Sequence, residues 1–316
     1  MIKILANDGI EAEAKSMLET AGFYVETAKV AQADLIKELP KYEVITVRSA
    51  TQVRKELIDA CPNLKVIARG GVGVDNIDVD YAKSKGINVI TTPAASSRSV
   101  AELALAHILS LSRFVHNANR DMATGDFKKL KNYYATGIEL KGKTIGIIGF
   151  GRIGQELAKL AMGMGLKVIY SDPILPEAQL EMDLYTTHDV RFSVKLHASS
   201  FDDILTLSDF ISVHTPALKK PLIGAEELAK MKQGAIIINC ARGGVIDEAA
   251  LLDALNAGQI GGAGLDAFMN EPTPLPTLLN HARISVSPHI GASTNEAQKN
   301  IGKELAEKIT AHFANK

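Results

Sequence analysis

Short apolar runs rich in β-branched residues alternate with stretches of helical periodicity along almost the whole chain. This alternation limits the possible folds most strongly, because it is typical of parallel sheets covered by helices and not of β-sandwiches or helix bundles. The first part of the chain predicts strands at Ile2–Ala6, Tyr24–Thr27, Val44–Val47, Lys65–Ala68 and Asn88–Thr91. A second series follows, with strands predicted at Thr144–Ile148, Lys167–Ser171, Phe210–Val213, Ala235–Asn239, Ala263–Ala267 and Ile284–Ser287. The class is therefore α/β, with two doubly wound parallel sheets.

The length of 316 residues exceeds what one ordinary hydrophobic core covers, so two domains are expected. A break at Thr91–Pro93 separates the two series of strands, and Ser293–Phe313 has the pattern of one amphipathic helix. That helix is expected to pack back onto the first sheet. We therefore predict a discontinuous domain of residues 1–93 and 292–316, with residues 94–291 inserted as a second domain.

Two Ser-x-x-Glu sequences, Ser99 with Glu102 and Ser293 with Glu296, predict helix N-termini by the capping-box pattern. The first opens a long helix that runs to about Asn117 and is apolar on more than one face. Such a helix must be covered on most sides. We interpret it as a homodimer contact, and the dimer could pair further into a tetramer. The alternative is a core helix between the domains of a monomer.

Composition excludes several classes of protein. The formal net charge is −1, with 35 basic and 36 acidic residues, and the basic ones are scattered, so a nucleic-acid binder is not expected. No apolar run reaches membrane-spanning length and the N-terminus lacks a signal segment, so a cytoplasmic protein is expected. Cys61 and Cys240 have neither disulfide nor metal-ligand spacing, and no metal is predicted.

A glycine-rich turn predicts the cofactor site. The pattern G-x-G-x-x-G lies directly after a predicted strand and before a predicted helix, with its members at Gly149, Gly151, Arg152, Ile153 and Gly154. The glycines permit a tight turn, close approach to a pyrophosphate and close helix packing, while the helix N-terminus offers N–H groups to the anion. Asp172 ends the next strand, where a carboxylate can bind ribose hydroxyls and repel a 2′-phosphate. This predicts a Rossmann domain that binds NAD rather than NADP, inserted into a flavodoxin-like domain.

Polar residues follow the later strands of the same sheet, where ligands of open α/β sheets bind. They are His214, Thr215 and Pro216, then Cys240, Ala241 and Arg242, then Asp266 and Glu271, and finally His289 and Gly291. Oxidising a secondary alcohol needs a base, an anchor for the substrate anion and a group that polarises the oxygen. Imidazole exchanges protons near neutral pH, a neighbouring carboxylate fixes its tautomer, and arginine grips a carboxylate with two N–H groups. We therefore predict His289, Glu271 and Arg242 as catalytic residues.

The chain resembles the D-2-hydroxyacid dehydrogenase family over nearly its whole length, and within it the D-3-phosphoglycerate dehydrogenases. The matching segments are Arg48–Thr51, Arg69–Asp78, Gly149–Gly154, His214–Pro216, Asn239–Gly244, Leu265–Pro272 and Pro288–Thr294. The resemblance implies the same catalytic set, Arg242, Glu271 and His289, with Asp266 near the nicotinamide amide. It also implies that the first domain binds substrate, with the backbone around Val72 and Gly73 holding the substrate carboxylate. Arg48, Ser49 and Arg69, together with Arg242 and His289, complete the predicted substrate site.

The chain departs from the family pattern at three places. Residues 92–97 lack the usual Asn-containing loop, the polar stretch from Pro176 to Ala198 is longer than expected, and Ala217–Gly224 is short. These departures bear on the rim of the cofactor site and not on the chemistry. We expect no regulatory domain after Lys316, and therefore no control by a separate serine-binding module.

The leading hypothesis is NAD-dependent oxidation of 3-phospho-D-glycerate to 3-phosphohydroxypyruvate, the first step of serine biosynthesis. The first alternative is the same chemistry on a 2-keto acid without phosphate, such as glyoxylate or hydroxypyruvate. A second alternative is a non-enzymatic NAD-sensing protein of the corepressor type, since one scaffold supports several functions. The intact Arg–Glu–His set argues against that alternative.

Overall fold

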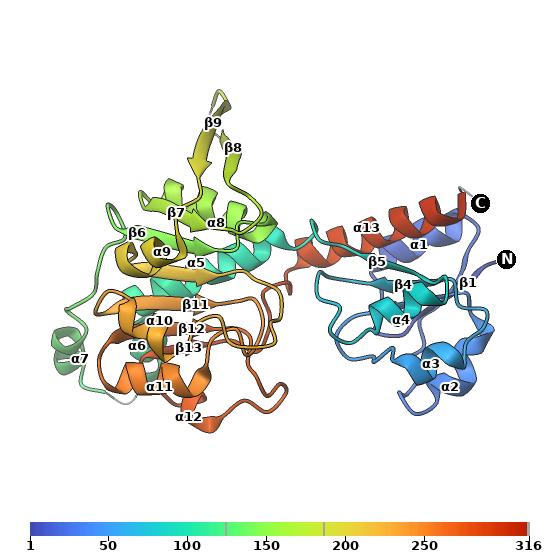
Figure 1. Ribbon diagram of the computed structural model, residues 1–316, viewed down its shortest axis with the longest axis horizontal. Helices are drawn as coiled ribbons and strands as arrows, with labels where there is room; N and C mark the ends of the chain where they lie inside the picture. The colour runs from blue at the N-terminus through green and yellow to red at the C-terminus, as the bar shows by residue number, and fades with distance from the viewer. Residues whose placement is uncertain (124, 186, 315–316) are drawn as a thin grey trace. The chain divides into compact units, whose positions relative to one another are not determined.

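The computed structural model describes residues 1–123, 125–185 and 187–314 (Figure 1). The chain forms two compact units, Met1–Ser96 with Ala292–Lys316, and Ser97–Gly291. Both units are α/β and the main sheet of each is parallel, which confirms the predicted fold class.

The first unit contains a five-stranded sheet of order β2-β1-β3-β4-β5, which is the flavodoxin-like order. Its strands are β1 (Lys3–Ala6), β2 (Tyr24–Glu26), β3 (Val44–Val47), β4 (Val66–Arg69) and β5 (Asn88–Thr91). Its helices are α1 (Ala12–Thr20), α2 (Leu35–Glu38), the 3-10 helix η1 (Leu39–Lys41), α3 (Lys55–Asp59), α4 (Val79–Ser84) and α13 (Asn295–Ala314). Each predicted strand is confirmed to within one residue at either end.

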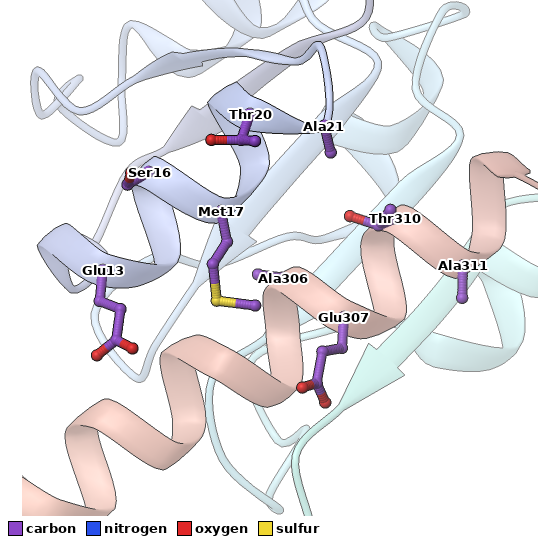
Figure 2. A pocket seen from close by; sticks show the side chains of 9 residues that line it. All are labelled: Glu13, Ser16, Met17, Thr20, Ala21, Ala306, Glu307, Thr310 and Ala311. Atoms are coloured by element: carbon purple, nitrogen blue, oxygen red, sulfur yellow. The ribbon is translucent and has the colours of Figure 1, made fainter.

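Helices α1 and α13 lie side by side on one face of this sheet, although they come from opposite ends of the chain (Figure 1). Gly302 permits their close approach, because a Cβ there would lie 2.9 Å from the Cβ of Ala14. An open groove runs between the two helices, and in Figure 2 Met17 of α1 points toward Ala306 of α13. None of the predicted site residues lines this groove.

The second unit contains a six-stranded sheet of order β13-β12-β11-β10-β6-β7. Its strands are β6 (Thr144–Ile148), β7 (Lys167–Ser171), β10 (Phe210–Val213), β11 (Ala235–Asn239), β12 (Ile260–Leu265) and β13 (Ile284–Val286). All six predicted strands are present, and β12 begins earlier than predicted. In the common dinucleotide-binding order a further strand flanks the second one. In the described part of this chain no such strand joins the sheet beside β7.

The stretch from Pro176 to Ala198, interpreted from its sequence as an overlong polar connection, instead forms an antiparallel hairpin of β8 (Glu177–Leu184) and β9 (Val190–His197). Ala178 and Leu180 pack on the core of the unit, and the opposite face is polar. The hairpin projects from the unit beside α8 in Figure 1. The regular alternation of polar and apolar residues from Glu177 explains why this stretch is a strand and not a loop.

Helices cover both faces of the six-stranded sheet. The helices of this unit are α5 (Ser97–Ser112), α6 (Val115–Asp121), α7 (Phe127–Tyr133), α8 (Arg152–Gly163), α9 (Phe201–Leu207), α10 (Ala225–Lys230), α11 (Glu248–Asn256) and α12 (Pro276–Leu279), and α7 alone among the longer ones has no buried residue in the described structure. Helix α5 packs against α8 and against β11, β12 and β13, so its own unit covers much of its apolar surface. Its role in a homodimer stays a prediction.

Both predicted capping boxes were placed wrongly. Helix α5 starts at Ser97, so Ser99 and Glu102 lie inside it, and it ends at Ser112 because Phe114 adopts a left-handed backbone with φ of 56°. Helix α13 starts at Asn295, and the Thr294 hydroxyl, not Ser293, accepts the Ala297 amide at 3.1 Å. In each region neighbouring hydroxyl residues compete for the cap, and the sequence pattern does not rank them.

Within the described residues, no helix is long and apolar enough to cross a membrane. The same residues contain no group of three or more His, Cys, Asp or Glu side chains that could hold a metal ion. Cys61 and Cys240 are buried, unpaired thiols.

Candidate active site

The topology of the second unit brings the predicted cofactor and catalytic residues to one edge of its sheet. The glycine-rich turn follows β6, Asp172 follows β7, and His214 follows β10. Arg242 follows β11, Glu271 follows β12 and His289 follows β13. Because all six strands are parallel, these segments lie at the carboxyl edge where ligands of such sheets bind.

The three glycines of the turn after β6 have different surroundings. A Cβ at Gly149, where φ is +87°, would lie 2.6 Å from the His214 carbonyl oxygen, and one at Gly154 would lie 2.4 Å from the Gly149 carbonyl oxygen. A Cβ at Gly151 would meet no described atom within 4 Å. The fold therefore requires Gly149 and Gly154, whereas Gly151 leaves open space at the N-terminus of α8. Arg152 and Ile153 begin that helix, so their N–H groups face this space and fit a pyrophosphate.

Asp172 accepts three backbone hydrogen bonds beside this turn. One carboxylate oxygen binds the Phe150 amide at 2.8 Å, and the other binds the Ile174 and Leu175 amides at 2.8 and 3.0 Å. Burial raises the pKa of Asp172, but the three N–H groups outweigh it, so its pKa lies below the ordinary value. An ionised carboxylate next to the glycine turn fits a ribose diol and disfavours a 2′-phosphate.

His214 and Thr215 contribute buried polar atoms next to Gly149, and Pro216 ends this segment. The His214 Nε2 lies 2.9 Å from the Ser212 hydroxyl, and burial lowers the pKa of His214 to about 4. Nδ1 of His214 and the hydroxyl of Thr215 are buried without a hydrogen-bond partner among the described residues. Such orphaned polar groups are uncommon and fit a site that a polar ligand completes.

Glu271 and His289 form the central pair of the site. Nδ1 of His289 lies 2.9 and 2.8 Å from the two carboxylate oxygens of Glu271, and one of those oxygens also accepts the Phe268 amide at 2.9 Å. Because a carboxylate only accepts, Nδ1 of His289 carries the proton. Nε2 is then the nitrogen that can take a proton from a substrate.

The turn that carries Arg242 is braced by Asn239, the last residue of β11. The Asn239 side chain donates to the Arg242 carbonyl at 2.8 Å and accepts the Ala241 amide at 3.0 Å. The Arg242 guanidinium donates to the Ala241 carbonyl at 2.7 Å. Burial raises the pKa of the Cys240 thiol, which therefore stays protonated and unreactive.

Asp266 is fully buried and holds the backbone that follows His289. Its carboxylate accepts the Ser287 hydroxyl at 2.6 Å and the Ile290 and Gly291 amides at 2.8 Å each. A carboxylate has about four acceptor sites, so one is left for a further donor such as a nicotinamide amide.

In the first unit, Arg48 follows β3 and Arg69 ends the adjacent strand β4. The Arg48 guanidinium lies 3.7 Å from Glu11, and the Arg69 guanidinium donates to the Gly70 carbonyl. Ser49 is exposed beside Arg48. The turn with Val72 and Gly73 follows β4 directly, and in the described structure the amides of these two residues donate no hydrogen bond.

Comparison with known proteins agrees with this arrangement. Residues 105–291 match the family described as D-isomer specific 2-hydroxyacid dehydrogenase, NAD binding domain. The chain belongs to this family. Its cofactor is NAD, and its second unit is the NAD-binding domain.

Among relatives, the hydroxypyruvate reductase of Thermotoga maritima is 42% identical, and the alignment covers 97% of each chain. The D-3-phosphoglycerate dehydrogenase of Archaeoglobus fulgidus is 41% identical over 98% of this chain, which spans only 56% of that relative's length. A solved structure of a glyoxylate reductase from Paecilomyes thermophila superposes with a TM-score of 0.83 at 28% identity, covering 98% of this chain and 94% of the other. These relatives are named for different substrates, so the comparison establishes the family of this dehydrogenase and leaves its substrate open.

Sequence reasoning missed several residues that support the site. The buried Glu248 of α11 accepts the Met269 amide at 2.7 Å and so ties this helix to the loop that carries Glu271. In the first unit, Asp8 accepts the Arg48 amide at 2.7 Å, and the Asn76 side chain donates to the Arg48 carbonyl at 2.8 Å. These partners are far apart in sequence, so no local pattern identifies them.

Proposed function

We propose that this dehydrogenase oxidises 3-phospho-D-glycerate to 3-phosphohydroxypyruvate in serine biosynthesis, with NAD⁺ as the oxidant. The observation that carries this proposal is the pair Arg48 and Arg69 at the ends of adjacent strands, next to the two unbonded amides of Val72 and Gly73. The substrate has two anionic groups. Two guanidinium groups suit a phosphate, and paired backbone N–H groups suit a carboxylate.

In this proposal His289, Glu271 and Arg242 carry out the chemistry. Nε2 of His289 accepts the proton of the C2 hydroxyl, while Glu271 holds the ring through Nδ1 and balances the positive charge that forms. Arg242 binds the substrate carboxylate and the oxygen at C2. NAD⁺, when bound, takes up the hydride that leaves C2. In the reverse direction the same His289 returns its proton to the keto oxygen.

The substrate assignment is tested by NADH oxidation with phosphohydroxypyruvate, hydroxypyruvate, glyoxylate and pyruvate, compared by kcat/KM. The proposal expects phosphohydroxypyruvate to be preferred by at least about tenfold, and Arg48→Glu to abolish this preference. Arg191→Glu is the matched control, because it reverses a charge on the exposed hairpin of the other unit. A flat profile, or a preference that survives Arg48→Glu, contradicts the phosphate-binding role.

A second candidate is reduction of hydroxypyruvate or glyoxylate, and the structure offers a specific observation in its favour. Arg48 already has an acidic neighbour in Glu11, and Arg69 already donates to the Gly70 carbonyl. Arginines with internal partners are less available to a phosphate. If this candidate is right, substrates without phosphate give the higher kcat/KM, and Arg48→Glu changes all four values by a similar factor.

A further inference from the structure

In the second unit, a chain of hydrogen bonds leads from the interior to the backbone on either side of His289. It starts at His107 on α5, whose side chain is only 4% exposed. The ring nitrogens Nδ1 and Nε2 lie 2.9 Å from the hydroxyls of Ser285 and Ser287, respectively. The Ser287 hydroxyl then reaches Asp266 at 2.6 Å. Four polar side chains are thus linked by hydrogen bonds.

The directions of these hydrogen bonds follow from which groups can donate. The carboxylate of Asp266 only accepts, so Ser287 donates its single proton to Asp266. The Ser287 oxygen must then accept from Nε2–H of His107. Nδ1 of His107 is therefore unprotonated and accepts a hydrogen bond from the Ser285 hydroxyl. Burial lowers the pKa of His107 and outweighs the opposing charge of Asp266, which agrees with a neutral ring.

This chain of hydrogen bonds ends on the backbone next to His289. Asp266 holds the Ile290 and Gly291 amides, and the His289 amide donates to the Ser287 carbonyl at 3.0 Å. His289 itself has a φ of +53°, a left-handed conformation that is unfavourable for residues other than glycine. Such a conformation persists only where surrounding contacts fix it. The hydrogen bonds of Asp266 and Ser287 are contacts of this kind.

Strand β12 is shaped to admit the imidazole. A Cβ at Gly264 would lie 2.7 Å from Cβ of His107 and 3.0 Å from its Cγ, so only glycine lets the ring lie against the strand. Gly264 stands two positions before Asp266, which follows the end of this strand. The imidazole of α5 therefore fits against β12 next to the residues that lead to Asp266.

We propose that His107 is a positioning residue for the dehydrogenase reaction, acting through Ser287 and Asp266 on the backbone conformation of His289. This inference rests on the proposed role of His289 as the proton acceptor. It predicts that loss of the link misplaces Nε2 of His289 and lowers kcat. KM should change little, because the substrate-binding residues of the first unit are not altered. A role in packing alone would lower stability and leave kcat of the folded enzyme unchanged.

The test is a double-mutant cycle in the full chain with NADH and the preferred keto acid. His107→Leu and Ser287→Ala should each lower kcat about tenfold with KM changed less than about threefold, and the double variant should be no slower than the slower single one, because both break one link. His107→Gln should recover most of kcat, since its amide can donate to Ser287 and accept from Ser285. His116→Leu is the matched control, because His116 also binds a serine hydroxyl, Ser110, outside this chain of hydrogen bonds. Independent, multiplying losses in the double variant, or a wild-type kcat in folded His107→Leu, overturn the inference.

A second measurement does not depend on the variants folding. ¹⁵N spectra of histidine-labelled wild-type enzyme with bound NAD⁺ should show His107 neutral and protonated at Nε2 near pH 7. A ring protonated at Nδ1, or at both nitrogens, overturns the inference. The two proposals fail separately: an active His289→Ala variant contradicts the proposed function, whereas an inactive His289→Ala with a fully active His107→Leu contradicts only the role of His107.

Discussion

Replacing Glu271 by glutamine should disable the enzyme by reversing the tautomer of His289. One oxygen of Glu271 accepts the Phe268 amide at 2.9 Å, and this N–H group requires an acceptor. In Glu271→Gln the amide oxygen therefore stays on Phe268 and the NH₂ group turns toward Nδ1 of His289, which lies 2.8 Å from the other oxygen in the wild type. Because an NH₂ group only donates, it favours the tautomer in which Nδ1 accepts and Nε2 carries the proton, and the base is lost.

The size of the effect follows from the role that is lost. General base catalysis contributes about 10²–10⁴-fold, which corresponds to about 3 to 5 kcal/mol in the activation free energy. Stability should change little. The side chains of His289 and Glu271 are 47% and 37% exposed, so solvent screens the pair and its contribution to the free energy of unfolding stays below about 1 kcal/mol.

The assay is steady-state NAD⁺ reduction with a saturating 2-hydroxy acid, the direction in which Nε2 must accept a proton, together with NAD⁺ affinity by calorimetry and the unfolding temperature. We expect kcat to fall at least about 100-fold, with NAD⁺ affinity and unfolding temperature close to those of the wild type. Glu177→Gln is the matched control, because it makes the same change on the exposed hairpin and should leave kcat unchanged. A Glu271→Gln enzyme with kcat within about threefold of the wild type would refute the reasoning.

Three further predictions concern the second unit. Gly151→Ala should fold with an unchanged unfolding temperature and bind NAD⁺ at least about tenfold more weakly, whereas Gly154→Ala should lower the unfolding temperature because its Cβ meets backbone at 2.4 Å; calorimetry and thermal scans separate the two. Asp172→Asn should raise the kcat/KM ratio of NADPH to NADH about tenfold or more, and an unchanged ratio would remove Asp172 from cofactor selection. The pKa of His214 is about 4 in the folded protein against about 6.5 when unfolded. The neutral ring therefore contributes fully to the free energy of unfolding above pH 6.5, and this contribution falls toward pH 4 by at most about 1.4 kcal/mol per pH unit. The free energy of unfolding, measured with urea at several pH values in this window, should fall less steeply with decreasing pH in His214→Gln than in the wild type. An equal pH dependence contradicts the assignment.

Local patterns were sufficient for the strands and for the turn after β6. Strands such as β3 and β11 are buried on both faces, so they are continuous apolar runs that need no knowledge of their neighbours. Gly154 is required by a contact within the turn itself, because a Cβ there would lie 2.4 Å from the Gly149 carbonyl oxygen. The pair of His289 and Glu271 was predicted because each residue lies in the segment that follows a strand of the same parallel sheet.

The remaining features depend on distant partners. His107 has the sequence signature of a core helix residue, and only its hydrogen bonds to Ser285 and Ser287, far along the chain, give it a role. The end of α5 was missed because Phe114 has a left-handed backbone without being glycine. The hairpin of β8 and β9 did have a local signal in the alternation from Glu177, which its overall polarity concealed.

The most direct test of the central claim is NADH oxidation by wild type and His289→Ala under saturating keto acid, with the NAD⁺ dissociation constant measured in parallel. If His289 exchanges the proton with the substrate oxygen, kcat falls at least about 100-fold and the NAD⁺ dissociation constant changes by less than about twofold. An enzyme that keeps its kcat without the imidazole would contradict the assignment of the site.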